Sequence, residues 1–169
     1  MTRLFYGMKK LISIPLILIL GILLSGCPYE SPFPIDTPGI KIDPKILGTW
    51  EELKDHAIYK IAKKDNFTYS IEITEQKDCK VDRNIGYLSA VNGVMFLNLL
   101  EDKPSVTEKK YSFYKLKITS TDKLSVSPVT SNIREQFNSS SSLKKFIAAN
   151  MKNSYFFEPE ASFIRRGNQ

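Results

Sequence analysis

The chain has little of what enzymes use: its 169 residues include one histidine, two cysteines and one tryptophan. No second metal ligand stands at a suitable spacing from His56, and neither a nucleophile motif nor a glycine-rich phosphate loop is present. Glu51 and Glu52 cannot work as a pair, because successive strand residues point to opposite faces. We therefore expect no catalytic residues, no metal site, no cofactor and no enzymatic activity, with His56 on a surface turn.

The N-terminus carries the most specific pattern in the chain. Arg3 and Lys9-Lys10 give a basic start, and residues 11–24 form an apolar run too short to span a membrane. Two small residues then precede a cysteine in Leu24-Ser25-Gly26-Cys27. This stretch resembles the signal of bacterial lipoproteins. The alternative interpretation is an uncleaved anchor helix with an ordinary buried thiol.

The lipoprotein resemblance implies a processed and acylated protein. Residues 1–26 would be a signal peptide, and Cys27 would become the lipidated first residue, carrying acyl chains such as palmitate. The expected location is the bacterial cell envelope, attached to a membrane by this lipid. Pro28 stands where some inner-membrane lipoproteins have aspartate, which favours the outer membrane.

Charge and cysteine content exclude some partners. Without residues 1–26 the formal charge falls from +6 to +3, because that segment has three basic residues and no acidic ones. The remaining basic residues occur as pairs rather than runs, so we expect no nucleic-acid partner. Once Cys27 is acylated, Cys79 has no cysteine left to pair with. It is either a buried small side chain, which we favour, or an exposed thiol.

The mature chain divides into a tether and one folded domain. Five prolines between Pro28 and Pro44 disfavour helix and strand pairing, so residues 27–45 are expected to form an extended tether that begins at the lipidated cysteine. Residues 46–169 change to a period of two, which is typical of half-buried strands. There is no room for a second domain.

The strands are expected to follow one another as hairpins. Asn92-Gly93 favours a type I′ turn between two runs, 85–91 and 94–100, that are apolar on nearly every residue. One face of this pair should meet the core, and the other a helix or a neighbouring segment. A helix capped by Ser141 or Ser142 should end near Asn153. The other predicted strands cover 57–62, 66–74, 111–118 and 123–127, with short pieces at 155–157 and 163–165.

This pattern predicts a mainly all-β fold, an eight-stranded antiparallel meander barrel with one C-terminal α-helix. Gly48-Thr49-Trp50 resembles the Gly-x-Trp motif of lipocalins, and residues 47–51 are similar to the opening of lipocalin-like domains in bacterial lipoproteins. Gly48 would let the chain pass close to the barrel floor, and Trp50 would plug that end. The second lipocalin pattern, Thr-Asp-Tyr, is only half present, since Lys123 follows Thr121-Asp122.

Aromatic residues spread over several strands are candidates for a ligand pocket. An eight-stranded barrel has room either for its own side chains or for one small apolar molecule, and bulky residues favour a filled or narrow interior. Two hypotheses stay open. One is a lipid-anchored module that binds a small apolar ligand such as a fatty acid, and the other is a non-enzymatic interaction or inhibitor protein with a filled barrel. The candidate ligand-binding residues are Tyr59, Phe67, Tyr69, Tyr87, Phe96 and Tyr114.

Overall fold

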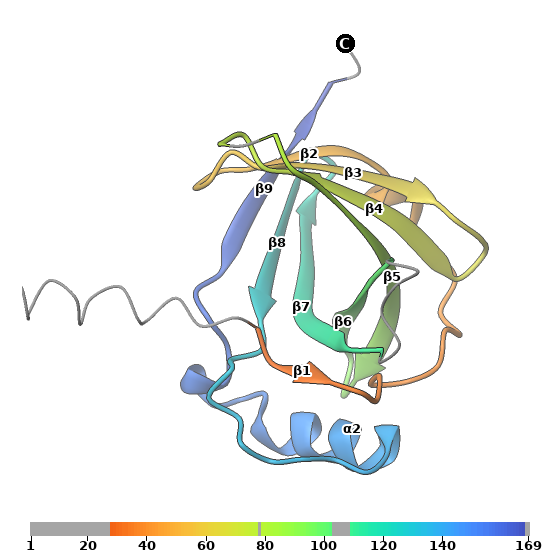
Figure 1. Cartoon of the computed structure of the whole chain (residues 1–169), viewed down its shortest axis with the longest axis vertical. Coiled ribbons are helices and arrows are strands. Elements are labelled where there is room, and N and C mark those ends of the chain that lie inside the picture. The colour runs from red at the N-terminus through yellow and green to blue at the C-terminus, as the bar shows by residue number, and fades with distance from the viewer. Residues whose placement is uncertain (1–27, 78, 103–108, 168–169) are drawn as a thin grey trace, which may run out of the picture.

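The structure is a computed structural model that describes residues 28–77, 79–102 and 109–167. Eight antiparallel strands close into a barrel, because each pairs with the next and the last pairs with the first (Figure 1). The predicted fold class is therefore confirmed. The barrel strands are β2 (Gly48–Glu52), β3 (Ile58–Lys63), β4 (Thr68–Thr74), β5 (Val81–Val91), β6 (Val94–Glu101), β7 (Tyr111–Ser120), β8 (Lys123–Pro128) and β9 (Ala161–Arg166).

The β5–β6 hairpin has the predicted turn. Asn92 and Gly93 have φ angles of 48° and 80°, and a type I′ turn needs positive values at both positions. β5 is longer than predicted, because it begins at Val81, where Asp82 and Asn84 interrupt the apolar run. Polar residues at the start of a strand weaken the pattern on which sequence analysis depends.

The C-terminal elements differ in their bounds from the prediction. Helix α2 spans Ser140–Asn150, and its N-cap is Ser139, whose hydroxyl accepts a hydrogen bond from the Ser142 amide at 3.2 Å. The predicted caps at Ser141 and Ser142 and the end near Asn153 are therefore wrong by a few residues. The expected strand piece at 155–157 is also wrong, since a 3-10 turn, η3 (Ser154–Phe156), occupies most of it.

A second core lies on the outer face of β5, β6 and β7. Helix α2 packs there, and in Figure 1 it lies below the barrel on the side crossed by the N-terminal segment. This packing confirms that the two central strands are buried on both faces. The buried members of this second core are Ile35, Val91, Phe96, Phe113, Val129, Leu143, Ile147 and Phe156.

The expectation that residues 28–45 form an unpaired tether is wrong for its described part. Strand β1 (Glu30–Ser31) pairs with the start of β7, and the Tyr29 amide donates to the carbonyl of Val129 at 3.0 Å. Ile35 is fully buried, and its amide donates to the Asn98 side-chain oxygen at 2.9 Å. The prolines limit pairing to two residues of β1, but they do not prevent the segment from packing.

Asn98 explains why this segment stays on the barrel. Its side chain is fully buried on the outer face of β6, where its amide nitrogen donates to Ser89 Oγ at 2.8 Å. Its oxygen is left to accept from Ile35, and Lys144 of helix α2 adds an ion pair to Asp36 at 2.7 Å. A buried amide must have partners, so the segment completes the second core.

Two residues singled out in the sequence lie in turns. His56 lies between β2 and β3 with its side chain 59% exposed, as expected for a surface histidine. Cys79 is exposed in the turn between β4 and β5 with a φ of 54°, so the favoured interpretation as a buried side chain is wrong. Its neighbours are polar, and this was the signal for the exposed alternative.

A candidate ligand cavity inside the barrel

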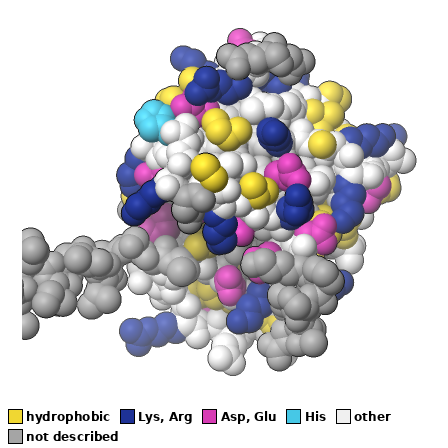
Figure 2. Space-filling model, turned by 45° about the horizontal axis from the view of Figure 1, so that its top comes forward, with side chains coloured by type: hydrophobic (Ala, Val, Ile, Leu, Met, Phe, Trp, Pro, Cys, Tyr) yellow, Lys and Arg dark blue, Asp and Glu magenta, His cyan; other side chains and the backbone are white. Residues whose placement is uncertain are grey.

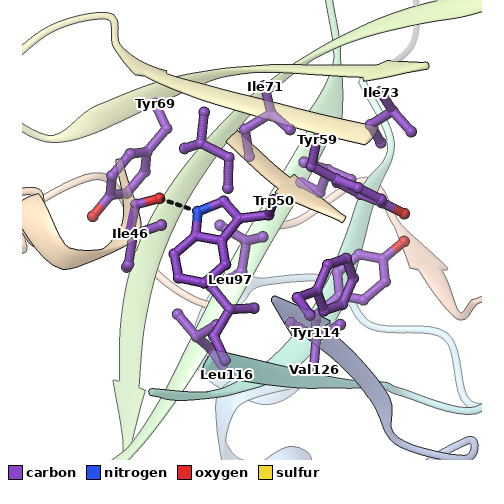
Figure 3. A pocket seen from close by; sticks show the side chains of 14 residues that line it. Ile46, Trp50, Tyr59, Tyr69, Ile71, Ile73, Leu97, Tyr114, Leu116 and Val126 are labelled. Carbon is purple, nitrogen blue, oxygen red and sulfur yellow. Dashed lines mark hydrogen bonds between the residues drawn. The ribbon is translucent and has the colours of Figure 1, made fainter. Parts of the chain in front are cut away.

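The barrel encloses a cavity of about 100 Å³ lined by fourteen side chains (Figure 3). All of them are aliphatic or aromatic, and they come from η2 (Pro44–Ile46) and every barrel strand except β5. On β5, Gly86 is one of the inward positions. A Cβ atom there would lie 2.7 Å from the Ile71 side chain and 3.0 Å from that of Leu97. The missing side chain therefore leaves room for these two residues to fill the interior.

Trp50 closes one end of the cavity. Its ring is fully buried, and its Nε1 donates a hydrogen bond to the carbonyl of Ile46 at 2.9 Å (Figure 3). The Arg165 guanidinium lies 4.2 Å from the ring centroid, which is within cation–π range. Trp50 therefore lies between η2, which crosses this end of the barrel, and a cation from the last strand.

At Gly48 the backbone passes close to the guanidinium of Arg165. The Gly48 φ of 128° is one that other residues rarely adopt, and a Cβ atom there would lie 2.5 Å from Arg165 Nη1. The guanidinium uses this space to donate to the carbonyls of Leu47 and Lys45, both at 2.6 Å. The two motif residues Gly48 and Trp50 thus share one partner, Arg165, which the sequence analysis did not identify.

At the opposite end the cavity carries two phenols. The hydroxyls of Tyr59 and Tyr114 lie beside each other in Figure 3, on the side away from Ile46. The pKa of both phenols is raised to about 12, mainly by burial, and for Tyr59 also by Tyr114 and by the charges of Glu52, Asp55 and Glu75. For Tyr114, a hydrogen bond with Ser112 opposes part of the effect of burial on its pKa. Both phenols are therefore protonated near neutral pH.

Three of the six candidate ligand-binding residues line this cavity, and three do not. Tyr59, Tyr69 and Tyr114 face inward. Tyr87 and Phe96 belong to the outer face, where Phe96 joins the second core, and Phe67 precedes β4 with 38% of its surface exposed. The prediction chose the right strands, but on β5 and β6 it assigned outward-facing residues to the inner face. Aliphatic residues such as Leu97 and Leu116 provide much of the lining and were missed.

Glu51 and Glu52 point to opposite faces, as predicted. On the outer face, Glu51 accepts from His56 Nδ1 at 2.9 Å and from Arg166 Nε at 2.6 Å, and these bonds hold its pKa below the usual value. On the inner face, Glu52 is buried beside Phe163 and accepts a hydrogen bond from the Asp55 amide. The single histidine therefore contacts Glu51 on the outside of the barrel.

In the described ranges 28–77, 79–102 and 109–167, no three His, Cys, Asp or Glu residues gather in a way that could hold a metal ion. None of the helices in these ranges has the length and apolarity needed to cross a membrane. Figure 2 shows lysine and arginine side chains mixed with acidic ones, without a patch of one sign on the face drawn.

A second hollow, of about 660 Å³, lies between the N-terminal segment and residues 131–137. It is open and lined by both polar and apolar residues, among them Pro28, Arg134 and Phe137. The Tyr29 hydroxyl donates to the carbonyl of Glu135 at 3.2 Å across it. Because this hollow is more open than the cavity inside the barrel, it encloses a ligand less well.

The fold is a closed eight-stranded antiparallel barrel, consistent with a lipocalin-like barrel. Comparisons with family models, with curated proteins and with solved structures give no match for this chain.

The two phenols should make stability depend on alkaline pH. A phenol ionises at pH 10.0 when unfolded but only near 12 inside this barrel, so the unfolded chain loses protons first. Their contribution to the free energy of unfolding is thus complete below pH 10 and is lost as the pH rises towards 12. Chemical unfolding across this interval should show a steeper fall for the wild type than for Tyr59→Phe. Equal slopes would contradict the burial of Tyr59.

Proposed function

We propose that this chain is a non-enzymatic, lipid-anchored binding protein of the bacterial cell envelope whose barrel takes up a small apolar group. The observation that carries the binding proposal is the cavity inside the barrel, whose fourteen lining side chains are all aliphatic or aromatic. Such a surface favours apolar groups, because transfer from water to an apolar site is favourable.

The size of the cavity limits the ligand. Its volume of about 100 Å³ lies below the roughly 300 Å³ at which drug-sized ligand sites begin. It is also smaller than the engineered cavity of about 150 Å³ that binds benzene. A complete fatty acid therefore does not fit without movement of the lining residues. A short unbranched alkyl chain is the ligand we propose.

The anchor proposal rests on the sequence alone. Leu24-Ser25-Gly26-Cys27 and the preceding residues lie outside the described part of the chain, so the structure does not bear on the lipid. The proposed attachment is through acyl groups on Cys27, with the outer membrane favoured. Because residues from Pro28 onward already pack on the barrel, the domain would lie directly beside its lipid.

A titration with butanol tests the binding proposal. The probe is added to the chain from Pro28 to Gln169, which holds every strand and helix of the described structure, and Trp50 fluorescence is followed. Trp50 is the only tryptophan and lines the cavity, so binding should change its emission. Leu99→Phe, which fills the cavity, should abolish the change.

The neighbouring substitution Leu100→Phe is the control, because Leu100 pairs with Ile85 and Tyr111 on the outer face of β6. It should leave binding intact. A wild-type protein that binds no butanol, by fluorescence and by calorimetry, would reject the ligand proposal.

A filled-barrel interaction protein is the second candidate. The small cavity volume favours it, since most of the interior is already occupied by the chain's own side chains. In that case function would reside in the surface loops, and Leu99→Phe would leave the cellular phenotype unchanged.

A further inference from the structure

The chemistry of the end of the barrel that carries Tyr59 and Tyr114 restricts the class of ligand, if the proposed binding function holds. The cavity is apolar from Trp50 up to the two phenols, and polar groups begin at Tyr59 and Tyr114. A bound molecule would therefore place its tail towards Trp50 and its head beside these hydroxyls. The groups around that position decide which head is preferred.

Three carboxylates lie near enough to this end of the barrel for their charges to act on Tyr59. Strand alternation places Glu52 on the same inward face of β2 as Trp50, and its side chain is buried beside Phe163. Glu75 comes directly after β4, two positions beyond the lining residue Ile73, and its side chain is exposed. Asp55 lies in the turn after β2, where its amide is held by the Glu52 carboxylate.

The electrostatic environment of Tyr59 agrees with this placement. After burial, the groups that raise its pKa include Tyr114 and the carboxylates Glu52, Asp55 and Glu75, so their negative field reaches the phenol. A basic residue, Lys80, lies in the turn after β4, and its Nζ forms an ion pair with Asp82 Oδ2 at 3.0 Å. A negative field at the rim of a low-dielectric cavity acts strongly on a charged head.

We infer that the barrel selects a positively charged ligand, namely a primary ammonium on a short unbranched apolar tail. The ammonium donates hydrogen bonds to the phenol oxygens and to a rim carboxylate, and charge-assisted bonds of this kind are strong. A fatty acid, the example given in the sequence analysis, would add the negative charge of its carboxylate to those of Glu52, Asp55 and Glu75. The inference rests on the proposed binding function, and it adds the charge of the ligand's head group, which that function does not specify.

The test compares three probes with the same tail: butylammonium, butanol and butanoate at neutral pH. Each is titrated into the chain from Pro28 to Gln169, with Trp50 fluorescence and calorimetry as readouts. Butylammonium should bind about tenfold more tightly than butanol, and butanoate about tenfold more weakly. The alcohol reports the apolar cavity alone, so it separates the tail from the charge.

Variants locate the charge effect. Glu75→Gln and Glu52→Gln should each reduce the advantage of butylammonium over butanol while leaving butanol affinity unchanged. Glutamine at position 52 keeps an acceptor for the Asp55 amide, which guards against unfolding. Glu72→Gln is the matched control, because Glu72 lies on the outer face of β4 and pairs with Arg83 at 3.1 Å. It should change neither affinity.

The outcomes separate the inference from the function it rests on. If butanol binds but butylammonium binds no more tightly, the charge selection is wrong and the binding function stands. If the order holds but Glu52→Gln and Glu75→Gln both leave it unchanged, these carboxylates are not its cause and the inference is overturned. If no probe binds, both proposals fail together.

Discussion

Trp50→Ala should lower the free energy of unfolding by about 4 kcal/mol, because it leaves a large void where the barrel is closed. The Trp50 ring is fully buried and donates to the carbonyl of Ile46. Alanine removes that donor and also leaves the Arg165 guanidinium without its aromatic partner. The loss of packing should dominate, since a neutral hydrogen bond contributes only about 1 kcal/mol.

Denaturant unfolding followed by far-ultraviolet circular dichroism measures this loss without depending on tryptophan emission. Tyr155→Ala is the control, because that side chain is 73% exposed and its removal should cost within about 0.5 kcal/mol. A loss below about 1 kcal/mol for Trp50→Ala would mean that Trp50 does not close the barrel.

Cys27→Ser should abolish acylation and with it all membrane attachment of the mature protein. A serine hydroxyl does not replace the thiol as the acceptor of the diacylglycerol group. Each buried methylene of an acyl chain contributes about 0.8 kcal/mol, so two chains hold a protein stably and their absence releases it. We expect the variant to lose incorporation of a labelled fatty acid and to leave the membrane fraction or accumulate as a precursor.

The second cysteine provides the control for this experiment. Cys79 is exposed in a turn of the barrel domain, so Cys79→Ser should keep both the label and the membrane attachment. Wild-type protein that incorporates no fatty acid would reject the lipid anchor.

The barrel was predictable because its signals are local. Alternation along 66–74 and the Asn92-Gly93 turn are each contained in a few neighbouring residues, and both are present in the structure. The phase of β5 and β6 was not predictable, because strands that are apolar on both faces do not reveal which side is inward. Tyr87 and Phe96 were therefore placed in the cavity although they pack outside it.

The packed N-terminal segment could not be predicted for a different reason. Its contacts join residues far apart in the chain, as in the bond from the Ile35 amide to the Asn98 side chain. Nothing near Ile35 in sequence indicates such a partner, and the prolines around it are equally typical of a linker. The polar Asn98 within the apolar run 94–100 was a signal, since a buried amide requires partners.

The order of the strands along the chain has a consequence for folding kinetics. β9 is made after helix α2, yet it lies between β8 and β2 and closes the ring. Until residues 161–166 have paired, β2 and β8 each keep an edge with free backbone donors and acceptors. Such edges recruit other chains, and pairing between distant segments forms slowly. The folding chain is thus most prone to aggregation while β9 is still unpaired.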